Sequence, residues 1–212
     1  MADTDLDSSY DNAPTVVSRP LTDRRLGLVF LLGGLVGLVG SAALAIERYL
    51  TLVNPDHRPS CSINGLLTCS PAMASPAGSL LGFPNPYLGL GAFSVVMTVG
   101  VVLLVAPGVA LPRWFWRTFL AVATAGTGLV VFLVWTSVVE LRALCPYCMV
   151  VWAATLPVWW YVLVRNVEGG FLGGSGASTV VRMRGWILAV LYVVLAAVVV
   201  VGLGPTLLAT LG

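Results

Sequence analysis

Two pairs of cysteines are the residues of this 212-residue chain whose type and spacing point to chemistry. Cys145 and Cys148 form a Cys-Pro-Tyr-Cys motif, and a ring closed by such near neighbours is too small to join distant parts of a fold. Pairs with this spacing are usually redox centres or half of a metal site. Cys61 and Cys69 have seven residues between them, including Gly65, so this pair can close a disulfide or offer one sulfur to another partner. The two pairs together favour thiol–disulfide exchange, which proceeds through mixed disulfides.

A helix that begins at this motif would determine the positions of Cys145 and Cys148 and the pKa of a thiol at its start. Pro146 suits the first position of a helix, which places Cys145 at the cap and Cys148 one turn deeper on the same face. A helix N-terminus stabilises a thiolate and lowers its pKa. We therefore expect Cys145 to be accessible from an aqueous loop and Cys148 to face an apolar interior. One sulfur would then meet protein thiols, and the other a lipid-borne oxidant.

Each cysteine pair could instead have a structural or metal-binding role without redox chemistry. Cys145 and Cys148 could form a structural disulfide or half of a zinc site, but zinc requires four converging thiolate or histidine ligands. The single histidine, His57, lies in a charged stretch and is expected to be solvated, so we expect no metal. Cys61 and Cys69 could form a static disulfide that braces a loop.

The composition requires lipid as the solvent of the elements that carry these cysteines. Charged residues make up 9% of the chain, against roughly 25% in an ordinary soluble domain. Hydrophobic residues reach 58%, and the mean hydropathy is +0.95. A soluble fold of this size cannot bury so much apolar surface, so the lipid bilayer is an expected partner. The net charge of +2 gives no indication of a nucleic-acid partner.

Five apolar stretches are long enough to cross a bilayer. About 20 apolar residues span the hydrocarbon core as a helix, and a helix satisfies every backbone polar group on the way. The sequence therefore predicts an all-α membrane protein, with a four-helix transmembrane bundle core and a fifth transmembrane helix. The predicted spans are 26–47, 87–106, 115–139, 146–165 and 186–207.

The remaining segments give the organisation of the chain. Residues 1–25 are polar and are expected to form a disordered cytoplasmic tail. The core occupies 26–165 and includes an outer loop, 48–86, that carries the first cysteine pair. A Gly-rich cytoplasmic linker, 166–185, leads to the fifth helix within 186–212.

The placement of arginines predicts the orientation. With the N-terminus inside, eight arginines fall in cytoplasmic segments and three in outer ones, in accord with the positive-inside rule. This arrangement puts all four cysteines outside, where disulfides persist, in a multi-pass protein of the plasma (inner) membrane. The eight are Arg19, Arg24, Arg25, Arg113, Arg117, Arg165, Arg182 and Arg184, and the three are Arg48, Arg58 and Arg142.

The first span has a second interpretation as a signal peptide. Arg24 and Arg25 precede an apolar run that ends Ala43-Leu44-Ala45, which is typical of a cleavage site. The run of 21 residues is nevertheless longer than such regions usually are. We therefore favour a retained helix.

The whole combination resembles the vitamin K epoxide reductase family. The resemblance covers about Leu26 to Arg165: a four-helix core, a spaced cysteine pair in the first outer loop, and a C-x-x-C that opens the last core helix. A serine, Ser75, follows the second cysteine by six residues. The fifth helix is similar to that of bacterial members, where it often leads into a fused thioredoxin-like domain. This chain stops at Gly212, so we expect such a domain to be a separate protein.

The resemblance implies a role for each cysteine. Cys61 would take electrons from the thiols of the partner, and Cys69 would pass them on through a transient Cys69–Cys145 disulfide. Cys148 would then form the thiolate that faces the quinone.

The resemblance also implies a quinone pocket. Ser75 matches a loop serine that hydrogen-bonds a quinone oxygen, and Asn85 stands where animal members have an asparagine that faces the same pocket. Trp152 replaces a tyrosine of the animal enzymes, which favours quinone over epoxide as the substrate, and Leu88 is a further pocket candidate. Ser75 and Asn85 could instead cap short helices.

The implied function is that of a membrane thiol–quinone oxidoreductase. It would reoxidise a separate extracytoplasmic thioredoxin-fold protein and reduce a quinone, so that exported proteins acquire disulfides. The resemblance to bacterial members, with a coding bias that makes all eleven basic residues arginine, favours menaquinone. Two alternatives remain: a reductase of vitamin K epoxide itself, and a non-catalytic membrane scaffold with structural disulfides.

Overall fold

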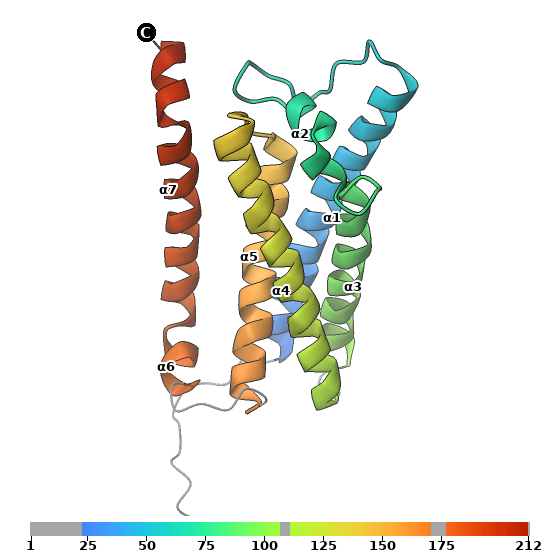
Figure 1. The fold of residues 1–212 in the computed structure, drawn as a ribbon. Coiled ribbons are helices and arrows are strands. Elements are labelled where there is room, and N and C mark those ends of the chain that lie inside the picture. Colours follow the sequence, from blue (N-terminus) through green and yellow to red (C-terminus); the bar gives the residue numbers. More distant parts are fainter. Residues whose placement is uncertain (1–22, 107–110, 171–176, 212) are drawn as a thin grey trace, which may run out of the picture.

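Five long helices dominate the computed structural model, which describes residues 23–106, 111–170 and 177–211 (Figure 1). Each is long and apolar enough to cross a membrane, so the predicted all-α, multi-pass architecture is confirmed. Most of the predicted tail, residues 1–22, lies outside the described residues. The five helices are α1 (Asp23–Val53), α3 (Pro86–Val105), α4 (Arg113–Trp135), α5 (Pro146–Glu168) and α7 (Arg184–Leu211).

Helix α1 is the centre of the four-helix core. It packs against both α3 and α5, while α4 packs against α5. The backbones of α1 and α3 come close together because glycines face each other: a Cβ on Gly100 would lie 2.6 Å from the Leu31 nitrogen, and one on Gly34 would lie 2.8 Å from the Met97 nitrogen. Small residues permit such approaches between membrane helices. The interpretation of the first span as a retained helix stays a prediction.

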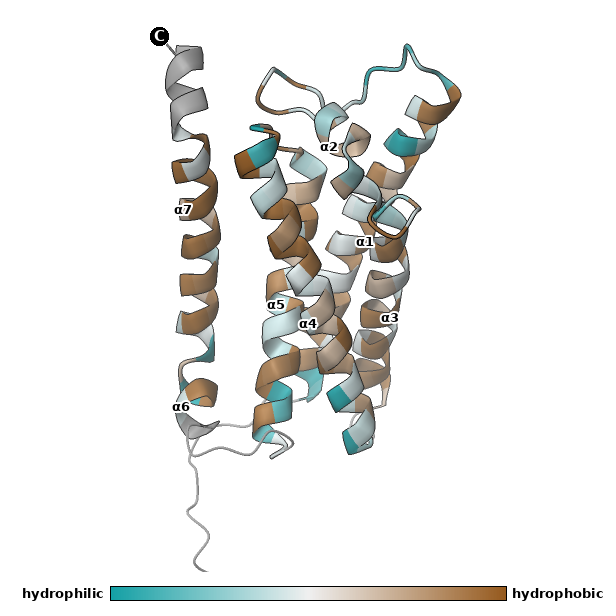
Figure 2. Cartoon of the chain, in the orientation of Figure 1, coloured by the Kyte–Doolittle hydropathy of each residue, from teal (hydrophilic) through white to brown (hydrophobic). Residues whose placement is uncertain are grey.

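The fifth long helix, α7, is peripheral to this core. Only 6% of its most apolar stretch is buried, against 39% in α1. The Tyr192 hydroxyl donates to the Ala153 carbonyl of α5 at 2.7 Å, and Arg142 Nη1 donates to the Gly202 carbonyl at 3.2 Å. Hydrophobic residues predominate along its described length (Figure 2), as expected for a helix that faces lipid.

The structure departs from the predicted boundaries at α1 and adds several short helices. Helix α1 runs on to Val53, beyond the predicted end at residue 47, because neither Gly nor Pro interrupts the chain between Gly40 and Pro55. The predicted linker 166–185 contains the last turn of α5 and a short helix, α6 (Ala177–Arg182). Three further short helices lie at the end of the bundle that carries the cysteines, at the top of Figure 1. They are α2 (Ser70–Ala74), the 3₁₀ helix η1 (Pro76–Ser79) and the π-helix η2 (Thr136–Glu140).

Candidate active site

Backbone hydrogen bonds fasten the cysteine loop to the connection between α4 and α5. The Thr68 N–H donates to the Leu144 carbonyl at 2.9 Å, and the Leu144 N–H donates to the Leu66 carbonyl at 2.8 Å. Leu67 and Leu144 thus form a short parallel β-bridge. The residues after this bridge, Cys69 and Cys145, are therefore brought side by side.

The sulfur atoms of three cysteines gather at this point. Cys61 and Cys69 form a disulfide, whereas Cys145 and Cys148 are free thiols. The Sγ atoms of Cys69 and Cys145 lie 2.8 Å apart, and those of Cys61, Cys69 and Cys145 all lie within 4.8 Å of one another. Exchange requires an attacking sulfur in contact with one sulfur of a disulfide. The cluster has this arrangement, because the free thiol of Cys145 contacts Cys69, one sulfur of the loop disulfide.

The start of α5 positions the second pair as the sequence predicts. Cys145 is the N-cap, Pro146 is the first residue of the helix, and the Cys148 N–H donates to Cys145 Sγ at 3.4 Å. Hydrogen bonds from the Cys148 thiol, and then from the backbone N–H groups of Cys148 and Tyr147, lower the pKa of Cys145 despite its burial. Cys145 is therefore prepared to act as a thiolate.

The accessibility of Cys145 differs from the prediction. Its side chain is only 1% exposed, because the loop disulfide lies over it. Cys148 is half-buried and lines a cavity beneath the cysteines. The pair is therefore reached from the loop side only through the disulfide of Cys61 and Cys69.

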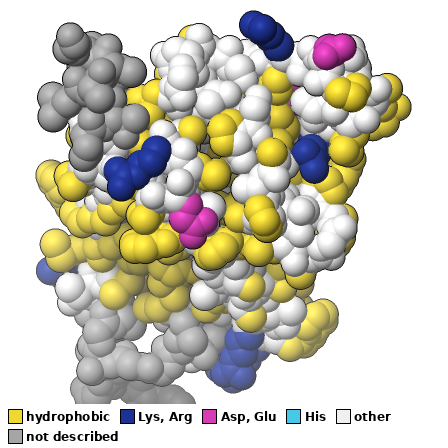
Figure 3. All heavy atoms as spheres, turned by 45° about the horizontal axis from the view of Figure 1, so that its top comes forward, with side chains coloured by type: hydrophobic (Ala, Val, Ile, Leu, Met, Phe, Trp, Pro, Cys, Tyr) yellow, Lys and Arg dark blue, Asp and Glu magenta, His cyan; other side chains and the backbone are white. Residues whose placement is uncertain are grey.

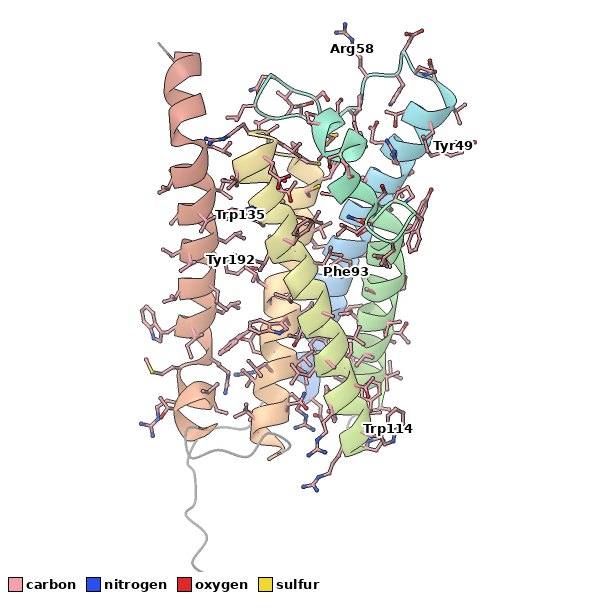
Figure 4. All side chains as sticks on the ribbon, viewed as in Figure 1. Tyr49, Arg58, Phe93, Trp114, Trp135 and Tyr192 are labelled. Atoms are coloured by element: carbon pink, nitrogen blue, oxygen red, sulfur yellow. A yellow bond between two sulfur atoms is a disulfide. The ribbon has the colours of Figure 1, made fainter. Side chains whose placement is uncertain are left out.

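A cavity of about 910 Å³ extends from the cysteines into the bundle. It is walled mainly by α3 and α4, which have little direct contact with each other. Phe93 lies partway along it, and Trp114 lies at the end of the bundle remote from the cysteines (Figure 4). Its size and its apolar lining are typical of sites for organic molecules.

The four predicted pocket residues all line this cavity: Ser75, Asn85, Leu88 and Trp152. Leu88 is half-buried, and Trp152 is 2% exposed in a packed cluster with Leu144 and Val138. Their contact with a ligand stays a prediction.

The polar groups of Ser75 and Asn85 are partly engaged by the loop itself. The Ser75 hydroxyl donates to the Ala72 carbonyl at 3.0 Å. Asn85 Nδ2 donates to the Ala77 carbonyl at 2.7 Å, and its Oδ1 accepts the Leu80 N–H at 3.2 Å. Neither side chain caps a helix. Each retains hydrogen-bonding capacity, a lone pair on the hydroxyl oxygen and a second amide N–H.

The sequence interpretation missed a polar cluster beside the cysteines. His57 Nε2 donates to Glu47 Oε2 at 2.9 Å, and Glu47 Oε1 accepts the backbone N–H of Ser60 at 3.1 Å and the Ser60 hydroxyl. The Ser60 hydroxyl also bonds the Tyr147 hydroxyl at 3.0 Å. His57 is thus hydrogen-bonded to the Glu47 carboxylate and 26% exposed, so it is partly buried where the sequence predicts a solvated side chain. The one available signal was Glu47, an acidic residue near the end of an apolar span.

Comparison with known proteins identifies the chain. A model of the vitamin K epoxide reductase family matches residues 28–163, which include all four cysteines and most of the core. A search of curated proteins found no match, and neither did a search of solved structures. Members of the matched family are quinone-dependent oxidoreductases. The chain is therefore a multi-pass membrane thiol oxidoreductase that belongs to the vitamin K epoxide reductase family.

Proposed function

We propose that the protein oxidises a separate thioredoxin-fold protein outside the cell membrane and reduces a membrane quinone. The observation that carries this proposal is the 2.8 Å contact between the sulfurs of Cys69 and Cys145, directly above an apolar cavity. A loop disulfide is thereby joined to a dithiol that lines a space suited to a lipid-soluble substrate.

Electrons pass from the partner to the loop pair first. A partner thiolate attacks Cys61 Sγ, so that Cys69 leaves as a thiolate, and the second partner thiol then releases Cys61. The Cys69 thiolate attacks Cys145 in a Cys145–Cys148 disulfide, and Cys148 leaves as a thiolate. Cys61 finally attacks Cys69 and frees Cys145. In the structure the loop pair is a disulfide and the inner pair consists of two free thiols, which corresponds to the product of this transfer.

The inner dithiol then gives two electrons and two protons to the quinone, which becomes a quinol, and the Cys145–Cys148 disulfide forms again. The net reaction converts a partner dithiol and a quinone into a partner disulfide and a quinol. The polar groups of Ser75 and Asn85 lie at the cysteine end of the cavity, where they can bond quinone oxygens. The apolar tail of the quinone fits the space between α3 and α4, and the similarity to bacterial members favours menaquinone.

The orientation of the bundle follows from its arginines. Those that flank the helix ends remote from the cysteines outnumber those at the cysteine end, which favours the cysteine end as the outer one. Figure 3, which looks obliquely onto this end, shows few charged side chains among hydrophobic and uncharged ones. A partner would therefore meet a weakly charged surface around the loop disulfide.

Two electron donors test the proposal. The purified protein in lipid nanodiscs is given menaquinone with either a reduced thioredoxin-fold protein or dithiothreitol, and quinol formation is followed by absorbance. We expect Cys61→Ala to abolish turnover with the protein donor and to keep turnover with the small dithiol, which can reduce the inner pair directly. Equal turnover of Cys61→Ala and the unchanged protein with the protein donor would contradict the proposed route.

A further inference from the structure

A buried carboxylate lies beside the cysteine cluster and has no part in the electron path. Glu47, near the end of α1, is 8% exposed. Removing a carboxylate from water is costly unless it is paired and hydrogen-bonded. Both oxygens of Glu47 are indeed occupied, Oε2 by His57 and Oε1 by the N–H and hydroxyl of Ser60. The fold therefore tolerates a buried charge at this position by surrounding it with donors.

These donors belong to the segment that leads directly to the first redox cysteine. Ser60 precedes Cys61, and His57 stands three residues before Ser60. The hydroxyl hydrogen of Ser60 goes to Glu47, so in the bond between Ser60 and Tyr147 the tyrosine is the donor. Tyr147 lies within the C-x-x-C motif. The cluster thus connects α1, the loop before Cys61 and the start of α5.

The loop disulfide is consequently held from two sides. On the Cys69 side, the β-bridge between Leu67 and Leu144 fixes the chain by backbone hydrogen bonds. On the Cys61 side, the hydrogen bonds of Ser60 to Glu47 and Tyr147 fix the chain. A shift of about 1 Å in a reacting group can cost roughly 100-fold in rate. Contacts that set the position of this disulfide therefore set how readily its sulfur meets Cys145.

We propose that Glu47 is a positioning residue for exchange between the two cysteine pairs: its carboxylate fixes Ser60, and through it the loop that carries Cys61 and Cys69, against Cys145. A carboxylate suits this task because charge-assisted hydrogen bonds are shorter and stronger than neutral ones. It can also accept from all three donors at once, whereas the amide of glutamine has only one acceptor atom. The role of Glu47 in turnover rests on the proposed function, but its role in positioning can be measured without quinone or partner.

The first test measures an equilibrium. In the double variant Cys61→Ala/Cys148→Ala, only Cys69 and Cys145 can form a disulfide. Glutathione buffers of graded redox composition, followed by alkylation and mass spectrometry, give the effective concentration of one thiol at the other. We expect Glu47→Gln in this background to lower that effective concentration about tenfold, the scale of losing a hydrogen bond to a charged group.

Two matched variants make the result specific. Glu140→Gln makes the same chemical change at an exposed position of η2, at the same end of the bundle, and is expected to leave the equilibrium unchanged. Ser60→Ala removes the hydroxyl without leaving a charge unpaired, and is expected to lower the effective concentration about threefold. It also keeps the test open if Glu47→Gln does not fold. An unchanged equilibrium in Ser60→Ala and Glu47→Gln, or an equal loss in Glu47→Gln and Glu140→Gln, would overturn the proposal.

The second test separates positioning from general stability. Glu47→Gln in the full chain should lower kcat with the protein donor about tenfold, the same loss as in the equilibrium. In the Cys61→Ala/Cys69→Ala background, where dithiothreitol reduces the inner pair directly, the same change should leave kcat unaltered. Equal losses in both backgrounds would assign Glu47 to general stability and overturn the proposal. If quinone turnover is absent altogether while the equilibrium responds to Glu47→Gln, the proposed function fails and the positioning role stands.

Discussion

The two ends of the helix bundle are held together by different means. At the end remote from the cysteines, aromatic side chains fill the space between α1, α4 and α5, and the Phe30 and Phe119 rings meet edge to face at 5.6 Å. There the buried Asn166 amide also donates to the Trp116 carbonyl at 3.0 Å. At the cysteine end, a disulfide, a β-bridge and a polar cluster hold a loop whose residues line one end of the cavity.

This difference separates stability from chemistry. Removing an apolar group from a densely packed core lowers the free energy of unfolding substantially. Each hydrogen bond that holds a loop contributes much less to that free energy. Electron transfer by exchange needs sulfurs that approach and separate, which a close-packed core would prevent. Four changes of decreasing expected effect test whether the two ends divide these tasks.

Cys148→Ala should have the largest effect, and on activity alone. Without this sulfur the inner disulfide cannot form, so we expect quinone reduction to fall at least about 10³-fold with either donor. The half-buried side chain is small, and the unfolding transition should move little. Quinol formation and thermal unfolding in the same nanodiscs give both numbers. Retained turnover would show that Cys148 is not the sulfur that meets the quinone.

Phe30→Ala should have the largest effect on stability. Its side chain is fully buried, and removing a buried aromatic ring typically costs about 3–5 kcal/mol. Denaturation in mixed micelles should show this loss, while the kcat of the molecules that remain folded changes little. Phe132→Ala, at an exposed position of α4, is the matched control with a small effect. A fall in kcat as great as that in Cys148→Ala would remove the distinction between the two ends.

The alkylation of Cys145 should show its lowered pKa. Because the loop disulfide covers this thiol, the measurement uses Cys61→Ala/Cys69→Ala, with mass spectrometry to tell the two remaining thiols apart. A depressed pKa keeps the thiolate at lower pH, so the midpoint of the rate should lie below the value of about 8.5 for an ordinary thiol. Adding Cys148→Ala removes the largest cause and should raise the midpoint. A midpoint at or above the ordinary value would contradict the geometry of the helix start.

Tyr192→Phe should have the smallest effect. It deletes the hydrogen bond from α7 to the Ala153 carbonyl, and such bonds between membrane helices contribute on average about 0.6 kcal/mol. Turnover should stay unchanged because α7 lies outside the four-helix core. A clear loss of turnover would show that this helix supports the site.

The sequence was sufficient to predict the spans and the position of the inner pair. Apolar length predicts membrane helices because lipid offers no other partner to the backbone, and Pro146 determines where α5 begins. The π-helix η2 was not predicted, since residues 136–140 read simply as the end of the third span. Most boundaries differ by only a few residues, except where α1 continues to Val53.

The contacts of the loop were harder to predict. That Cys69 meets Cys145 was expected only through the family resemblance, because the bridge between Leu67 and Leu144 joins residues far apart in sequence. The burial of Cys145 and the hydrogen bond between His57 and Glu47 depend on how the loop folds over the bundle. No periodicity or motif encodes such contacts.

The most direct test of the electron route is to stop it after its central step. In Cys61→Ala, the resolving sulfur is missing, so Cys69 should attack the Cys145–Cys148 disulfide and remain bonded to Cys145. The protein is oxidised with menaquinone, held without any reductant, alkylated and digested for mass spectrometry. The account predicts a peptide pair joined through Cys69 and Cys145, with Cys148 alkylated. An intact Cys145–Cys148 disulfide beside a free Cys69 would contradict it.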